Sequence, residues 1–184
     1  RFAAPNRYFS VNGGPLISGS SGNLALSGIN QVTGNPAGGD DIVTFNSMAN
    51  LPNIIVTDGA GTDQVRVNGT LALVPVGSFR VISDSISVGA GGSITTSGAG
   101  TIRLLGDAVA IDPAAAIISQ ASVELAPLTA GRAILLGSED ATALCLVDSE
   151  LDTITTPSLI IGSVTAGSAD VQGNTSPANA SSLV

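Results

Sequence analysis

A repeat of about 22 residues is the feature that most restricts how this chain folds. The segment Gly39–Asn46 aligns with Gly61–Asn68 at an offset of 22, with Gly, Asp, Val and Asn at matching positions. A unit of this length holds three short strands and cannot bury an apolar face by itself, so successive units must stack. The spacing continues at offsets of 21 to 23 between four aliphatic pairs, Val65 and Ile86, Ile86 and Val109, Ile94 and Ile117, and Ile102 and Val123.

Apolar residues alternate with polar ones in short pieces that end at Gly, Asn, Asp, Ser or Pro, which is typical of β-strands. The best helix candidate, Ala108 to Ser122, is also predicted as strands, because Pro113 and the β-branched pair Ile117-Ile118 disfavour a helix interior. We expect a single helical turn at Asp148 to Asp152, with Asp148 or Ser149 as its N-cap.

Stacked units of this kind predict an all-β protein, a right-handed parallel β-helix with three short strands per coil. Dividing 184 residues by the period gives about eight coils. The alternative is a β-sandwich, which also uses many short strands but does not require the recurrence. We divide the chain into an N-terminal docking or capping segment (residues 1–12), the β-helix (13–172) and a polar C-terminal tail (173–184).

The composition excludes several functions. The chain carries six basic and 14 acidic residues, a net charge of -8, so we expect no nucleic-acid partner. Histidine is absent, which removes Ser-His-Asp and Cys-His catalysis. No apolar run approaches the roughly 18 residues of a membrane span. The single cysteine, Cys145, lies in an apolar run and is predicted to be a core residue. Because the sequence starts with Arg1, we expect a processed product or a fragment.

Two patterns in the sequence are candidates for a chemical site. The adjacent acids Asp40-Asp41 and Glu139-Asp140 point to opposite faces of a strand, which is poor geometry for a catalytic carboxylate pair, so we interpret both as turns. The segment Asp58–Val65 resembles the calcium-binding nonapeptide of β-roll proteins, and residues 38–41 are a poorer copy. Since the copies are 22 residues apart rather than in tandem, structural turn glycines are favoured. We therefore expect no enzyme, no catalytic residue, no metal site and no cofactor.

The C-terminal third carries a resemblance. The segments Val123–Gly137, Leu144–Leu146, Asp148–Thr155 and Leu159–Gly162 together resemble a repeat unit of filamentous-hemagglutinin-like and autotransporter-like bacterial exoproteins, whose adhesin passengers are long β-helices. The resemblance extends over about 50 residues, through Val171. It implies secretion by a Gram-negative bacterium, an extracellular or cell-surface location, and a role as stalk, adhesin or matrix fibre.

The chain ends hold the candidate docking residues. Phe2, Tyr8 and Phe9 are three of the five aromatic residues, and Leu183 and Val184 end the polar tail. Because a β-helix has open strand edges at its ends, the aromatic segment is predicted either to fold back as a cap or to dock on a neighbouring copy.

These observations predict a secreted, non-enzymatic structural protein, a β-helical subunit that self-associates into an extracellular filament, matrix fibre or adhesive surface layer. Its expected partners are copies of itself, with cell-surface carbohydrate as a further candidate. The alternatives are a carbohydrate-binding or polysaccharide-degrading β-helix and a stalk fragment of a giant adhesin.

Overall fold

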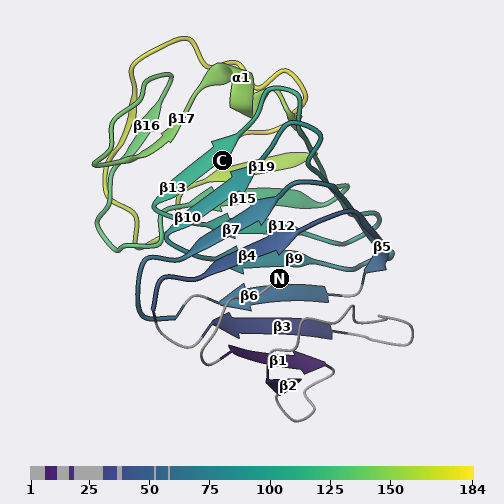
Figure 1. Cartoon of the computed structure of the whole chain (residues 1–184). Coiled ribbons are helices and arrows are strands. Elements are labelled where there is room, and N and C mark those ends of the chain that lie inside the picture. The colour runs from purple at the N-terminus through teal and green to yellow at the C-terminus, as the bar shows by residue number, and fades with distance from the viewer. Residues whose placement is uncertain (1–6, 12–16, 19–30, 37–38, 52, 58) are drawn as a thin grey trace.

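The fold is all-β, with its strands gathered into mainly parallel sheets (Figure 1). The computed structural model describes residues 7–11, 17–18, 31–36, 39–51, 53–57 and 59–184. Over this part of the chain the one helix is the single turn α1 (Asp148–Leu151). No helix there has the length and apolarity needed to cross a membrane.

Four sheets share the strands. Sheet A has the order β19 (Ser158–Ile161), β15 (Ser122–Ala126), β12 (Ile102–Leu105), β9 (Phe79–Ile82), β6 (Asn53–Thr57), β3 (Gln31–Pro36), β1 (Arg7–Val11) and β2 (Ile17–Ser18). Sheet B has the order β13 (Ala108–Ile111), β10 (Ser85–Val88), β7 (Gln64–Val67) and β4 (Ile42–Phe45). Sheet C has the order β18 (Ile154–Thr155), β14 (Ala116–Ile118), β11 (Ser93–Thr95), β8 (Thr70–Leu73) and β5 (Met48–Leu51). Sheet D has the order β17 (Leu144–Leu146), β16 (Ile134–Leu136) and β20 (Ala169–Val171).

The chain visits sheets B, C and A in turn and so winds a β-solenoid. From β4 to β15 it makes about four turns, and each strand pairs in parallel with the equivalent strand one turn away. Figure 1 shows these turns stacked along one axis, with β1 and β2 at one end and β13 and β19 at the other. The prediction of a parallel β-helix is confirmed. The sandwich alternative does not fit, because such sandwiches pack antiparallel sheets.

The sequence offsets between aliphatic residues match the pairing of residues on neighbouring strands. Val65 pairs with Ile86 and Ile86 with Val109, as their spacings of 21 and 23 predict. Equivalent inward positions form ladders of aliphatic and aromatic side chains, and burying each contributes about 1.5–3 kcal/mol. The sheet A ladder consists of Ile54, Phe79, Ile102, Val123 and Leu159, each at most 1% exposed.

The expectation of about eight coils is not met, because two parts of the chain do not add turns. At the N-terminal end, β1 pairs antiparallel with both β2 and β3 and so leaves the winding. After β15 the spacing between paired residues rises: Ile117 pairs with Ile154 and Val123 with Leu159, which are 37 and 36 positions apart. An insertion between β15 and β18 therefore interrupts the repeat.

The insertion (residues 127–153) carries β16, β17 and α1; in Figure 1, β16 and β17 lie at the upper left and α1 at the top of the stack. The predicted helical turn is confirmed, but the predicted N-cap is wrong. Val147 occupies that position, and its extended backbone precedes Asp148. Its side chain has no acceptor atom, and instead the Glu150 carboxylate reaches back to the Val147 amide at 3.0 Å.

Candidate functional site

The docking candidates near the N-terminus lie on or beside β1. Tyr8 pairs with Asn35 and Phe9 with Gly34, so this strand lies along the edge of β3 in its own chain. Phe2 is outside the described residues. Docking on another copy stays a prediction for these three aromatic residues.

The docking candidates at the C-terminus lie on the opposite end of sheet A. Leu183 and Val184 are 54% and 71% exposed. Their backbone runs along β19: the Val184 amide donates to the Leu159 carbonyl at 2.9 Å, and the Ile161 amide donates to the Val184 carbonyl at 2.9 Å. The end of the tail thus covers the last strand of sheet A, and its role in docking remains a prediction.

Aspartates stack along one corner of the solenoid, each directly before a strand of sheet B. This aspartate ladder consists of Asp41, Asp63, Asp84 and Asp107. Two of its carboxylates accept hydrogen bonds from backbone amides of the neighbouring turn, Asp63 from the Asp41 amide at 2.7 Å and Asp84 from the Asp63 amide at 2.8 Å. These acids join successive turns, which is a structural use of the negative charge.

The other motifs weighed from the sequence also lie in turns. Asp40 accepts a hydrogen bond from the Thr62 amide at 2.9 Å, whereas its neighbour Asp41 is buried. In the glycine motif, Gly61 has φ +145° and a Cβ there would lie 2.4 Å from the Gly39 carbonyl oxygen, so only glycine fits. Asp58 lies outside the described residues. Among the residues described, no three His, Cys, Asp or Glu side chains are placed to hold a metal ion.

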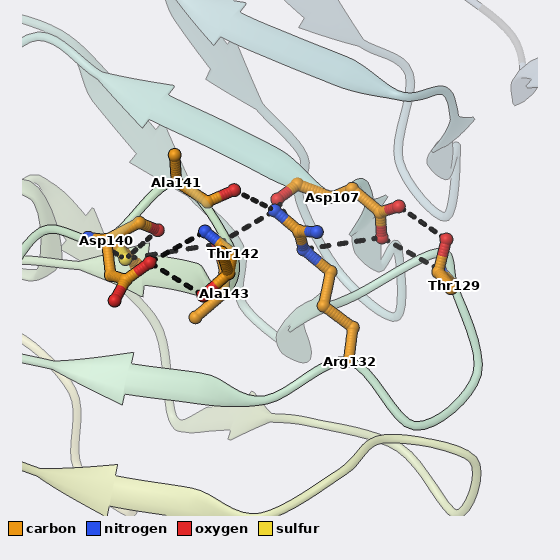
Figure 2. Close-up of polar contacts among 8 residues, drawn as sticks. Asp107, Thr129, Arg132, Asp140, Ala141, Thr142 and Ala143 are labelled. Carbon is orange, nitrogen blue, oxygen red and sulfur yellow. Dashed lines mark hydrogen bonds and ion pairs between the residues drawn. The ribbon is translucent and has the colours of Figure 1, made fainter.

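A polar cluster centred on Arg132 joins the insertion to the solenoid (Figure 2). The Arg132 Nε donates to the Asp107 carbonyl at 3.1 Å and lies 3.8 Å from its carboxylate. The Nη2 donates to the carbonyls of Ala141 and Ala143 at 2.9 and 3.1 Å. Asp107 in turn accepts the Thr129 amide at 2.8 Å. One guanidinium therefore ties the last turn of the aspartate ladder to the loop before β17.

The loop itself is ordered around Asp140. Both the amide and the hydroxyl of Thr142 donate to its Oδ1, each at 2.7 Å. These two bonds, with the positive charge of Arg132, hold the pKa of Asp140 below its usual value of 3.8. The Cys145 thiol accepts the Asp140 amide at 2.9 Å and donates to the Asp140 carbonyl at 3.1 Å. Cys145 is buried, as its apolar surroundings in the sequence predict.

Glu150 is the buried carboxylate of the insertion, 8% exposed. Its Oε1 accepts the Ile111 amide at 2.9 Å and its Oε2 accepts the Val147 amide at 3.0 Å. Burial raises the pKa of Glu150 above its usual value of 4.5; the two amide hydrogen bonds oppose this shift, and the negative charge of Glu139 adds to it.

These groups line a cavity of about 390 Å³ between β13 and the insertion, with Asp107, Arg132, Glu139, Asp140, Cys145 and Glu150 on its walls. Four of the side chains on its walls are carboxylates, which can accept hydrogen bonds from the hydroxyl groups of a sugar. However, both Glu150 oxygens and three of the Arg132 hydrogen bonds are directed to the protein's own backbone. The cluster therefore mainly holds the insertion against the solenoid.

Sequence reasoning missed Arg132, Asp107 and Glu150 as a connected group. The available signal was charge: Arg132 is the one basic residue after Arg103 in a chain that has six. Its partner Asp107 is 25 positions away and belongs to a different turn, so the pairing follows from the winding and not from a local motif.

No protein-family model, no curated protein and no solved structure matches this chain. The resemblance to bacterial exoproteins therefore stays a prediction.

Proposed function

We propose that this chain is a non-enzymatic structural protein, a β-solenoid subunit that associates with copies of itself into an extracellular filament, matrix fibre or adhesive surface layer. The observation that supports the proposal is that the polar side chains bind backbone groups of the same chain. The aspartate ladder, Arg132 and Glu150 all hydrogen-bond backbone groups of their own chain. Side chains committed in this way stabilise a scaffold.

The location and handedness belong to the same proposal. Secretion by a Gram-negative bacterium rests on the resemblance of residues 123–171 to exoprotein repeats, together with a low content of charged residues, 11%. The coil is taken as right-handed, since crossovers between parallel strands almost always are.

Self-association of the purified full chain tests the proposal. Sedimentation velocity over roughly micromolar to millimolar protein should show concentration-dependent growth, and negative-stain electron microscopy of the concentrated samples should show fibres or sheets. A protein that stays monomeric over the whole range and forms no assemblies would contradict it. Surface proteolysis of intact cells, with a cytosolic protein as control, tests the extracellular location.

A second candidate function is carbohydrate binding or cleavage at the 390 Å³ cavity. It is favoured by two carboxyl groups there whose pKa values are shifted in opposite directions, Asp140 downward and Glu150 upward. Affinity for, and hydrolysis of, a panel of polysaccharides should then be lost in Asp140→Asn and unchanged in Asp40→Asn, which lies in a distant turn. No binding by the unmodified protein would remove this candidate.

A further inference from the structure

The corner between β7 and β8 consists of Asn68 and Gly69, the single Asn-Gly pair in the part of the chain that the structure describes. Asn68 is exposed and Gly69 is buried. The other Asn-Gly pair of the sequence, Asn12-Gly13, lies outside the described residues. An asparagine followed by glycine loses its side-chain amide more readily than other asparagines, because glycine has no Cβ to hinder attack by its own backbone nitrogen.

Neither reacting group of this pair is engaged elsewhere. Among the residues described, the Asn68 side chain and the Gly69 amide make no hydrogen bond. Other atoms hold the corner: the Asn68 amide donates to the Phe45 carbonyl at 2.9 Å, and the Gly69 carbonyl accepts the Ser93 amide at 3.1 Å. A hydrogen bond from the Gly69 amide would have to break before its nitrogen could attack, so its absence removes one barrier to the reaction.

The equivalent corner one turn earlier provides a comparison within the same molecule. Phe45 pairs with Val67 in sheet B, so the next residues, Asn46 and Ser47, occupy the positions of the Asn-Gly pair. Asn46 is also exposed. Ser47, unlike a glycine, carries a side chain, and its Oγ accepts the Thr70 amide at 3.1 Å. Two exposed asparagines in equivalent corners therefore differ in the residue that follows them.

We propose that Asn68 is a site of spontaneous covalent modification, which converts it to aspartate and isoaspartate through a cyclic succinimide. A base in the solvent removes the proton of the Gly69 amide, and the nitrogen attacks the Asn68 Cγ. The new N–Cγ bond replaces the Cγ–Nδ2 bond, and Nδ2 leaves as ammonia with a proton from water.

Water then opens the succinimide in one of two ways. Cleavage of the N–Cγ bond gives aspartate, and cleavage of the bond between this nitrogen and the main-chain carbonyl carbon of residue 68 gives isoaspartate. The nitrogen regains its proton from the same water. Overall, one water is consumed and one ammonia is released, so the reaction needs neither an oxidant nor a reductant.

The two products have different effects on the corner. Aspartate keeps the main chain and adds one negative charge at an exposed position. Isoaspartate carries the main chain through Cβ and Cγ and so lengthens it by one atom. The corner has little room for this change, since even a Cβ on Gly69 would lie 2.5 Å from the Ser47 nitrogen. The isoaspartate form should therefore move the Gly69 carbonyl away from the Ser93 amide and lower the thermal stability.

Ageing of the purified full chain in mildly alkaline buffer tests the site. Trypsin cleavage after Arg66 and Arg80 releases residues 67–80, a peptide in which Asn68 is the single asparagine. Its mass should rise by about 1 Da, and isoaspartyl methyltransferase should label it. Modification should be at least about tenfold faster than at Asn46, which fragment-ion spectra distinguish within its own peptide. A sample digested before ageing corrects for modification during digestion.

Matched variants test whether the Asn-Gly pair sets the rate. Asn68→Gln keeps an exposed side-chain amide but closes a ring far less readily, so modification of residues 67–80 should be lost. Ser47→Gly puts glycine after Asn46 and should bring modification of Asn46 close to the rate at Asn68. Asn68→Asp is the aspartate product and should melt at a higher temperature than the isoaspartate fraction of the aged protein. Thermal unfolding of each variant before ageing verifies folding.

Three results would overturn the inference. The first is a folded protein whose residues 67–80 gain no mass while the same chain aged in urea does, because the corner then holds the reacting groups apart. The second is modification of Asn46 and Asn68 at equal rates. The third is a Ser47→Gly variant in which Asn46 stays unmodified. The inference does not depend on the proposed self-association, so each of these results leaves that proposal to its own test.

Discussion

The Glu150 carboxylate accepts a hydrogen bond from the Ile111 amide, 39 positions earlier in the chain, at a distance of 2.9 Å. Ile111 ends β13, the last strand of sheet B, whose upper edge would otherwise present unpaired amides. The same carboxylate binds the Val147 amide at the start of α1. One side chain therefore joins the insertion to the solenoid and satisfies one amide of this sheet edge, which β17 of the same chain also contacts.

We predict that Glu150→Gln destabilises the protein by about 1–3 kcal/mol. A glutamine offers one acceptor oxygen, and its NH₂ group would face an amide N–H that also donates. Urea denaturation monitored by circular dichroism measures the change in free energy of unfolding. Glu139→Gln is the matched control, since Glu139 is exposed, and it should change stability by less than about 0.5 kcal/mol. Equal stability of the two variants would contradict a role for Glu150 as the anchor of the insertion.

Glu150 also predicts a dependence of stability on pH. Because the folded-state pKa is raised above the usual 4.5, the folded protein binds this proton more tightly than the unfolded chain does. The resulting stabilisation is complete below pH 4.5 and is lost as the pH rises through the raised value. As the pH increases across this window, the free energy of unfolding of the unmodified protein should therefore decrease relative to that of Glu150→Gln. Asp140 acts in the opposite sense, since its lowered pKa gives stability that is lost as pH falls through it.

Arg132 should matter for the order of the insertion. Arg132→Met keeps the aliphatic stem but leaves the carbonyls of Ala141 and Ala143 without their donor, for an expected loss of about 1–3 kcal/mol. Hydrogen exchange should accelerate over residues 128–146 and stay slow in β7 to β12. Arg66→Met, on an exposed position, is the control and should leave both regions unchanged. Uniform acceleration over the whole solenoid would show that the cluster stabilises more than the insertion.

Much of the solenoid could be predicted from the sequence, because its ladders are periodic in the chain. Val65, Ile86 and Val109 are about one turn apart in sequence and lie directly above one another in sheet B. Prediction from this periodicity was wrong where the chain departs from the regular turns of the solenoid. The antiparallel pairing of β1 and the 37-residue step from Ile117 to Ile154 have no periodic signal, so the number of coils was overestimated.

The candidate site was less predictable for a related reason. Arg132 meets Asp107, and Glu150 meets Ile111, only because separate turns bring them together. The resemblance drew attention to residues 123–162 as a unit but not to these contacts. The N-cap of α1 was misassigned because the usual polar residue is replaced by a glutamate reaching back from inside the helix.

Substitution of two turn glycines by alanine can distinguish a steric clash from backbone strain. Gly61 and Gly91 both have positive φ, +145° and +88°, but an added Cβ meets the Gly39 carbonyl oxygen at 2.4 Å in the first case and nothing within 4 Å in the second. Gly91→Ala should cost about 1 kcal/mol from backbone strain alone. Gly61→Ala should cost clearly more, because the turn formed by residues 39–40 must also move. Thermal and urea denaturation of both variants measure the difference, and equal losses would contradict the close approach of the two turns.

The antiparallel pairing of β1 with β3 leads to a prediction about the N-terminal segment. Removing residues 1–11 deletes a strand that covers β3 and leaves the backbone groups of that edge unpaired, so self-association measured by sedimentation should increase. Removing only residues 1–6 keeps β1 and is the matched control for the cap. A fall in association after the longer deletion would instead favour docking through Tyr8 and Phe9, and a fall after the shorter one would favour Phe2.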